Sequence, residues 1–249
     1  MKIQIVNDLH IECRNIPDID NVAPILVVAG DLCTWISKYA GVDLLNEWAE
    51  DRELVFFILG NHEYYHGNVA EVENFWFNEA PLSENVIMLR AGKPYYHDKG
   101  YLFVGDTLWT DLRNGSDSSL YATSLNDIRC TKGLTSELVC SRNLLVKDLL
   151  AQSIRAGGID KQVIMITHHL PMQEVISPRY VGDPLNSCFA NYDTWAENML
   201  REFDIPMWHF GHTHDPIDLN IRGCRFVCNP HGYYDECAST FNPAFVVEV

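Results

Sequence analysis

The sequence predicts an α/β layered fold, and three observations lead to this prediction. Short apolar runs rich in β-branched and aromatic residues end in glycine or polar residues, which is typical of buried strands. In the first part of the chain these strands alternate with helix-like stretches, a pattern that favours layered α/β proteins. The later strands follow one another more closely, as in hairpins, so one mixed sheet or two packed sheets would fit.

Each expected element follows from this pattern. The expected strands span residues 2–6, 25–29, 54–59, 101–104, 163–166, 206–210, 225–228 and 245–247. The expected helices span residues 41–49, 69–77, 137–154 and 192–203. The stretch 107–134 lacks clear periodicity and is rich in Ser, Asn, Asp and Gly. Long irregular segments in compact domains are often functional, so we expect a lid insertion there, with a plain surface excursion as the alternative.

Composition bounds the class of protein. The 249 residues suit one large domain or two small ones, and we expect a single domain over 1–249. Hydrophobic residues make up 47% and charged residues 21%, which is ordinary globular composition. The formal net charge of −16 makes nucleic acid an unlikely partner, because nucleic acid backbones bind mainly through Lys and Arg. A local basic patch would escape that argument.

The cysteines and the first residues bear on location. None of the eight cysteines forms a C-x-x-C pair, and the start MKIQIVNDLH resembles a strand leading to a polar site, not a secretory leader. We therefore expect a cytoplasmic protein with free thiols. No apolar run approaches about 18 residues, so no membrane span is expected.

Five expected strands end in residues that can bind metals. These residues are Asp8 and His10 after the first strand, Asp31 after the second, Asn61 and His62 after the third, His168 and His169 after the strand at 163–166, and His212 and His214 after the strand at 206–210. In layered α/β proteins, ligands gather where the carboxyl ends of strands meet. Oxygen and imidazole ligands without thiolate suit Mn, Fe, Zn, Co or Ni.

The spacing of these residues adds a geometric expectation. Asp8 and His10 are two residues apart, as are His212 and His214. In extended backbone, residues i and i+2 point to one side, so each pair could face one site. The glycines at positions 30, 60 and 211 are expected to permit tight turns and close backbone approach.

The motifs D-x-H, G-D, G-N-H-E, T-H-H and G-H-T-H, in this order, resemble the calcineurin-like metallophosphoesterase superfamily from Asp8 to His214. The resemblance implies a four-layer sandwich of two mixed β-sheets flanked by helices. Asp31 is not followed by the V-D-R-G of the protein-phosphatase branch, and Asn7 stands where Ser often precedes D-x-H. The stretches 107–111 and 229–233 resemble a bacterial and phage-type Ser/Thr-phosphatase-like subgroup that brings no known substrate.

The resemblance also implies roles for the matching residues. Asp8, His10 and His214 would bind one divalent metal, Asn61, His168 and His212 would bind a second, and Asp31 would bridge both. Manganese is the metal expected in vitro, with Fe, Zn, Co and Ni as alternatives. His62 would be catalytic, as a proton donor or charge stabiliser over the phosphate. The implied reaction is hydrolysis of a small phosphomonoester or phosphodiester by attack of a metal-bridging hydroxide.

Other polar and aromatic residues carry weaker expectations. We expect structural roles for His66, His97 and His209, and we expect Cys13 and Cys33 to be small buried fillers. Alternatives stay open for the residues that follow: His169 (outer shell or structural), His231 (near the site or structural), Glu63 (ligand-orienting carboxylate or surface salt bridge), and Tyr64, Tyr65, Trp109 and Tyr233 (substrate pocket or core).

Two rival functions remain beside the enzyme. A related fold that had lost catalysis would be a metal-binding interaction scaffold, but His62 and the full ligand set are present. A nuclease would need a local basic groove in an acidic chain. The natural substrate, the preference for monoesters or diesters, the physiological metal and the oligomeric state are not encoded in any recognisable motif.

Overall fold

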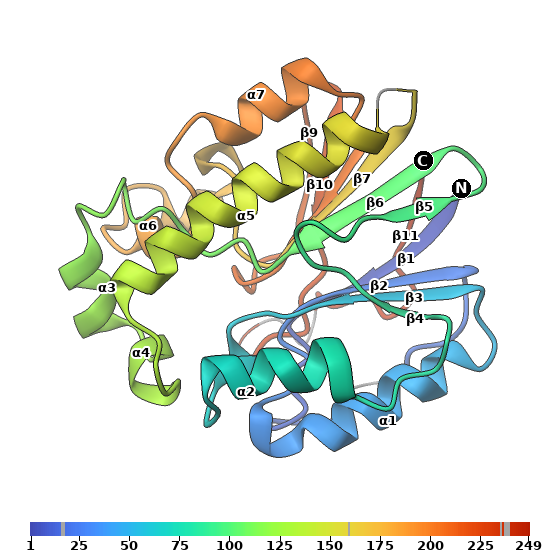
Figure 1. Ribbon diagram of the computed structural model, residues 1–249, viewed down its shortest axis with the longest axis horizontal. Helices are drawn as coiled ribbons and strands as arrows, with labels where there is room; N and C mark the ends of the chain where they lie inside the picture. Colours follow the sequence, from blue (N-terminus) through green and yellow to red (C-terminus); the bar gives the residue numbers. More distant parts are fainter. Residues whose placement is uncertain (16–17, 159, 235, 237–239) are drawn as a thin grey trace.

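Two β-sheets lie at the centre of the computed structural model, which describes residues 1–15, 18–158, 160–234, 236 and 240–249 (Figure 1). The first sheet has the order β11-β1-β2-β3-β4 and the second the order β5-β6-β7-β8-β10-β9. The strands of the first are β1 (Lys2–Val6), β2 (Ile25–Ala29), β3 (Leu54–Ile58), β4 (Val86–Met88) and β11 (Val246–Glu248). Those of the second are β5 (Tyr95–His97), β6 (Tyr101–Asp106), β7 (Gln162–Thr167), β8 (Met207–His209), β9 (Ile217–Ile221) and β10 (Cys224–Cys228).

Both sheets are mixed. Strands β1 to β4 run parallel, and β11 pairs antiparallel with β1 at the edge of the first sheet. In the second sheet β6, β7, β8 and β10 run parallel, while β5 and β9 pair antiparallel at the two edges. Because the central strands are parallel, the loops that follow their carboxyl ends gather at one edge of each sheet.

Alternating side chains build the layers, because successive residues of a strand point to opposite faces. In β2, Leu26 and Val28 belong to the core beneath the helices, whereas Ile25 and Val27 belong to the core between the sheets. The inner core joins both sheets directly: the ring of Phe56 in β3 stacks on that of Phe103 in β6, with centroids 4.2 Å apart.

Helices cover the two outer faces. Helices α1 (Lys38–Ala49) and α2 (Val69–Asn74) lie on the outer side of the first sheet, and α5 (Ser136–Gly157) and α7 (Trp195–Glu202) lie on the outer side of the second (Figure 1). Helix–sheet–sheet–helix packing confirms the predicted four-layer sandwich of two mixed sheets. It also decides between the one-sheet and two-sheet alternatives that the strand pattern left open.

Shorter helices complete the description. The short α-helices are α3 (Ser118–Ser124), α4 (Asp127–Cys130) and α6 (Asn186–Phe189). The 3₁₀ helices are η1 (Trp35–Ser37), η2 (His62–Tyr64), η4 (Gln173–Val175) and η5 (Pro178–Tyr180), and η3 (Phe75–Glu79) is a π-helix that continues α2. No described helix is long and apolar enough to cross a membrane.

Three strands escaped the sequence prediction: β4, β5 and β9. The first two are only three residues long, and β9 exposes three of its five residues at a sheet edge. Short and polar edge strands lack the apolar run on which the prediction depends. The stretch 107–134 holds α3 and α4, which lie near α6 at one end of the molecule (Figure 1). Its role as a lid and the single-domain assignment remain predictions.

Candidate metal centre

The loops after β1, β2, β7 and β8 bring imidazoles and carboxylates into two adjoining groups. In each group, one ligand atom of every residue lies within 4.8 Å of those of the others. The first group contains Asp8, His10, Asp31 and His214, and the second contains Asp31, His168 and His212. All of these residues are buried. Asp31 belongs to both groups, so the two candidate metal sites adjoin at one carboxylate.

One oxygen of Asp31 lies between the two groups. Its Oδ2 is 3.3 Å from His168 Nε2 and 3.7 Å from His10 Nε2. The other oxygen, Oδ1, accepts a hydrogen bond of 2.8 Å from the backbone N–H of His62. Divalent cations beside this carboxylate would compensate its charge, and the donor set of oxygen and imidazole fits divalent metals.

Asn61 supplies its amide oxygen to the second group. Its Oδ1 lies 2.9 Å from His168 Nε2, while its Nδ2 donates to Asp127 Oδ1 at 2.9 Å. Since a carboxylate can only accept, this contact fixes which end of the amide faces the candidate metal site.

The histidines have the orientation that metal-binding imidazoles need. His168 Nδ1 lies 2.9 Å from the carbonyl of Ala29, and His10 Nδ1 lies 3.1 Å from Glu12 Oε1. His214 Nδ1 bonds Glu236 Oε2. Each contact occupies Nδ1 and leaves Nε2 for the site, which is the usual arrangement behind a metal-bound histidine.

His212 provides a further test of whether these residues fit a metal. Its Nε2 is buried and has no hydrogen-bond partner within the described part of the chain. A buried, unpaired imidazole nitrogen is costly unless a ligand occupies it. Burial, reinforced by His169 and His168, lowers the pKa of His212 well below its usual value, and burial likewise lowers that of His10. Both rings are therefore neutral, as coordination requires.

The backbone at the site differs from the extended geometry that the residue spacing suggested. Five of the seven predicted ligands have positive φ: Asp8 (52°), His10 (47°), Asp31 (52°), His212 (68°) and His214 (50°). The left-handed region disfavours non-glycine residues, so this cluster is locally strained. The extended backbone assumed for the i, i+2 pairs was wrong. Asp8 and His10 fall into one group, whereas His212 and His214 fall into the two adjoining groups, as the resemblance implied.

Glycines permit the close approach of these loops, as expected. A Cβ on Gly60 would lie 2.1 Å from Asp31 Oδ1, and one on Gly30 would lie 2.6 Å from His168 Nδ1. Neither position can accept a side chain without displacing a candidate ligand.

Glu63 joins the loops that follow β2 and β3 through hydrogen bonds to their backbone. Its buried carboxylate accepts hydrogen bonds from four backbone N–H groups, those of Gly60, Asp31, Leu32 and Cys33, at 2.6 to 3.0 Å. Burial and the charge of Asp31 raise the pKa of Glu63 to about 7, and the N–H donors oppose that rise. The surface salt bridge considered for Glu63 was wrong: the side chain orients the backbone of the Asp31 loop.

His62 lies beside the two groups. Its Nδ1 is 2.9 Å from Glu12 Oε1, its Nε2 is 2.8 Å from the hydroxyl of Tyr233, and its ring is 4.4 Å from that of His10. Glu12 also binds His10, which explains why His10, Glu12 and His62 form a third close group. Burial opposes a charge on His62, but Asp31 and Glu12 outweigh it and raise its pKa to about 9.

The pKa values of the neighbouring residues His168 and His169 shift in opposite directions. Burial opposes a charge on His168, but Asp31 and Asp8 outweigh it and raise its pKa to about 10. A metal cation that bound to His168 would compete with the proton on its ring. Burial, together with His168, lowers the pKa of His169 to about 3. The His169 ring packs on His212 with centroids 4.2 Å apart, so it supports a candidate ligand and belongs to neither group.

Other histidines lie outside the groups. His209 Nε2 lies 3.0 Å from Asn7 Oδ1, and Asn7 in turn donates to Asp8. His97 contacts Glu53 and Asp98, and His66 is exposed. The His231 ring contacts the carbonyl of Leu9 and the ring of Phe241, which favours the structural role over the role at the site.

The cysteines and aromatics divide between core and surface. Cys33 is buried as expected, but Cys13 is exposed, because it lies in the turn that follows His10. No disulfide joins the cysteines that the structure describes, and Cys237 lies outside that part. Tyr64 and Trp109 belong to the core, whereas Tyr65 and Tyr233 line the pocket described next.

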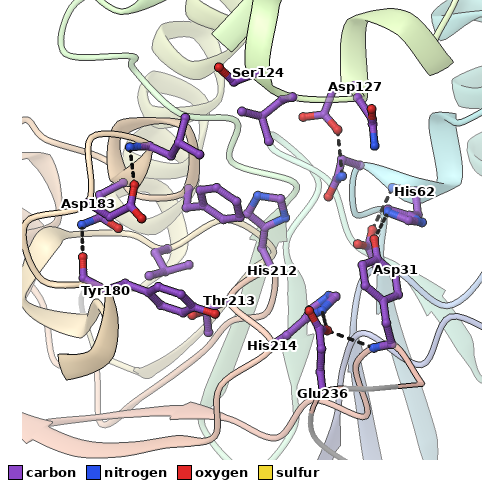
Figure 2. Close-up of a pocket in the computed structure, with 18 of the residues that line it drawn as sticks. Asp31, His62, Ser124, Asp127, Tyr180, Asp183, His212, Thr213, His214 and Glu236 are labelled. Atoms are coloured by element: carbon purple, nitrogen blue, oxygen red, sulfur yellow. Dashed lines mark hydrogen bonds and ion pairs between the residues drawn. The ribbon is translucent and has the colours of Figure 1, made fainter. Parts of the chain in front are cut away.

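A pocket of about 320 Å³ opens beside Asp31, His212 and His214 (Figure 2). Its floor includes Asn61 and His62. Residues 124–127 of the stretch 107–134 form one part of the lining. The segment after β7 forms another part, with the residues Leu170, Ile176, Tyr180, Asp183, Leu185, Asn186 and Phe189. Figure 2 shows Tyr180 and Asp183 across the pocket from His62 and Asp31.

Three acidic residues at the site escaped sequence reasoning: Glu12, Asp127 and Glu236. Glu12 stands two residues after His10 and extends the first motif to D-x-H-x-E, so its position was a usable signal. Asp127 contacts Asn61 across 66 positions from an aperiodic stretch, and Glu236 contacts His214 from a segment without a recognised pattern. Neither of these two gave a signal.

Two stacked mixed sheets gather carboxylates and imidazoles at their carboxyl edge, where these residues could hold metal ions. The chain belongs to the calcineurin-like phosphoesterase family, which it matches over residues 1–216.

Two proteins illustrate the similarity. Over 215 residues, 78% of this chain and 73% of the relative, it is 25% identical to the uncharacterized protein L509 of Acanthamoeba polyphaga mimivirus. The crystal structure of phosphopantetheinyl hydrolase from Mycobacterium tuberculosis superposes with a TM-score of 0.69, at 16% identity, over 100% of this chain and 95% of that one. That structural likeness shows the fold alone.

Proposed function

We propose that the protein is a dinuclear metal-dependent phosphoesterase that hydrolyses a small phosphomonoester or phosphodiester. The observation that carries this proposal is the shared carboxylate of Asp31, which belongs to both groups of candidate ligands. Asp8, His10 and His214 would hold one metal, and Asn61, His168 and His212 the other. Two cations so placed would polarise the phosphate ester and activate the attacking water.

The protein itself would manage the proton of the leaving group. Glu12 binds Nδ1 of His62 and stabilises the imidazolium, so Nε2 is the ring nitrogen left to deliver a proton. The hydroxyl of Tyr233 lies on that Nε2 and lines the pocket. His62 would therefore protonate the departing oxygen by one of two routes. Either the substrate displaces the Tyr233 hydroxyl and Nε2 donates directly, or the Tyr233 hydroxyl passes its own proton to the oxygen and takes one from Nε2.

The pocket favours an enzyme of small esters over the rival functions. It holds about 320 Å³, and none of its described lining residues is Lys or Arg. A nuclease would need cations along the track of the polyanion. An interaction scaffold would not need a pocket that joins both candidate metal groups to the catalytic candidate His62.

A metal titration coupled to a substrate panel tests the proposal. The protein would be stripped of metal with a chelator and reconstituted with Mn, Zn, Fe, Co or Ni. Metal content would then be measured, together with turnover of phosphomonoesters and phosphodiesters. We expect about two metals per chain at saturation, with activity that follows the second. Saturation at one metal would refute the dinuclear site. Full loading without hydrolysis of any ester would refute the enzymatic function. Manganese and a cytoplasmic location remain part of this proposal.

A further inference from the structure

Apolar side chains form part of the pocket wall, starting beside a candidate ligand. The ring of Phe189 packs on that of His212 with centroids 4.7 Å apart. Leu125, Ile176 and Leu185 also line the pocket. If a phosphate occupies the metal groups, as the proposed function requires, its organic substituent extends over this wall.

Apart from the histidines at the metal groups, the charged side chains that line the pocket are carboxylates. The lining includes Asp127, Asp183 and Glu236, and none of the described residues that line it is Lys or Arg. The cation nearest in sequence, Arg179, does not line the pocket: it bonds Asp215 at 2.8 Å and lies over the ring of Tyr180. The chain as a whole has a formal net charge of −16. An anionic group that extended away from the metal groups would therefore meet carboxylates, and no Lys or Arg among the described lining residues.

We propose that this wall binds an uncharged organic group and rejects a second anionic group on the substrate. The proposal rests on the proposed function for the position of the phosphate. It assigns specificity to Leu185, Phe189 and their neighbours, and it predicts phosphate esters of uncharged alcohols or phenols as substrates. Nucleoside polyphosphates and esters that carry carboxylates would be poor substrates, because desolvating an anion beside other carboxylates is costly.

Matched aryl phosphates test the proposal. Phenyl phosphate and 3-carboxyphenyl phosphate have similarly basic leaving groups and differ in one remote charge. We expect kcat/KM for the carboxylated ester to be lower by about tenfold or more. Equal values, or a preference for the carboxylated ester, would overturn the proposal.

A matched pair of variants attributes the effect to the wall. Leu185 is half-buried in the lining, so Leu185→Arg places a cation in the pocket. Leu144 on α5 is 66% exposed and lies outside the pocket lining, so Leu144→Arg adds the same charge elsewhere. We expect Leu185→Arg to narrow the ratio between the two esters, and Leu144→Arg to leave it at the wild-type value. An equal shift in both would mean that overall charge, not the wall, sets the preference.

Binding measurements with phosphonates test this proposal independently of the proposed function. Phenylphosphonate and 3-carboxyphenylphosphonate offer the same two organic groups but cannot be hydrolysed at the P–C bond, so calorimetric affinities need no turnover. Tighter binding of phenylphosphonate supports the wall even if no ester is hydrolysed, which would defeat only the enzymatic function. Equal affinities would defeat the wall even if both esters are hydrolysed.

Discussion

Asp127 offers a sharp perturbation, because one buried carboxylate connects the stretch 107–134 to a candidate metal ligand. Its Oδ1 accepts hydrogen bonds from Asn61 Nδ2 at 2.9 Å and from the hydroxyl of Tyr65 at 2.6 Å. Its Oδ2 accepts from the hydroxyl of Tyr121 at 2.8 Å. The residue is 1% exposed. Asp127→Ala removes the acceptor of all three donors at once.

The expected magnitude follows from these contacts. A hydrogen bond to a charged group contributes about 1.5–3 kcal/mol. Because Asp127 lines the pocket, water can reach part of the space left by the side chain, so we expect the free energy of unfolding to fall by about 2–4 kcal/mol in all. Asn61 also loses the contact that turns its Oδ1 toward His168. Loss of such an outer partner weakens metal affinity by about 10–100-fold.

Competition with a chromophoric chelator would measure the affinities of both metals, and thermal unfolding would report stability. We expect Asp127→Ala to weaken only one of the two affinities. Tyr121→Phe is the matched control, because it removes a donor to Asp127 without touching Asn61. Asp127→Asn should also retain affinity, since its amide oxygen can serve Asn61 while its NH₂ faces the hydroxyl of Tyr121.

Two results would refute this reasoning about Asp127. A folded Asp127→Ala protein with both affinities unchanged would show that Asn61 needs no orienting partner. A loss of affinity in Tyr121→Phe equal to that in Asp127→Ala would assign the effect to anchoring of the whole stretch, not to the orientation of Asn61.

Three further predictions concern the centre itself. Asp31→Asn should abolish turnover and release at least one metal while circular dichroism stays native, because a charge between two cations is lost; near wild-type activity would show that Asp31 does not bridge. His62→Ala should keep the metal content but lower turnover by about 10²–10⁴-fold, with a larger penalty for alkyl than for nitrophenyl esters, since only the alkoxide needs a proton. Equal penalties would favour a role in binding phosphate charge. Glu12→Gln should move the alkaline limb of the kcat–pH profile to lower pH, because Glu12 helps to raise the pKa of His62 to about 9 and its loss releases the proton earlier. An unmoved limb would exclude His62 as the proton donor.

The sequence predicted which loops gather the candidate ligands, because these residues lie within a few positions after strands. The strands at 2–6 and 25–29 were located to the residue, and Asp8 and Asp31 lie within two positions of their ends. Long apolar runs fix such strands, and parallel topology then brings their ends together. The same logic failed for the edge strand β9, where only Ile217 is buried.

The contacts that orient the ligands could not be predicted in the same way. Asn61 and Asp127, or His62 and Glu12, are joined by single side-chain hydrogen bonds between distant loops. The periodicity of the sequence does not predict such a contact between distant residues. The spacing also did not predict the backbone conformation: His212 and His214 have left-handed φ and fall into different groups.

Burial of charge gives a physical reason why cations would bind at the centre and not beside the other buried carboxylates. Among the described residues, the carboxylates of Asp8, Asp31, Glu63 and Asp127 are at most 1% exposed. Glu63 and Asp127 accept four and three hydrogen bonds from neutral donors, which can satisfy a buried anion.

Asp31 differs from those two, because its Oδ2 faces only the ring nitrogens of His168 and His10 in its nearest ion-pair contacts. A proton on one imidazole can compensate the carboxylate, but it would occupy the nitrogen that coordination requires. Divalent cations, if held by these residues, would compensate the same carboxylate and would leave both imidazoles neutral. The fold therefore concentrates its unmet negative charge at the oxygen shared by the two groups, and removing that charge should disturb metal binding before it disturbs folding.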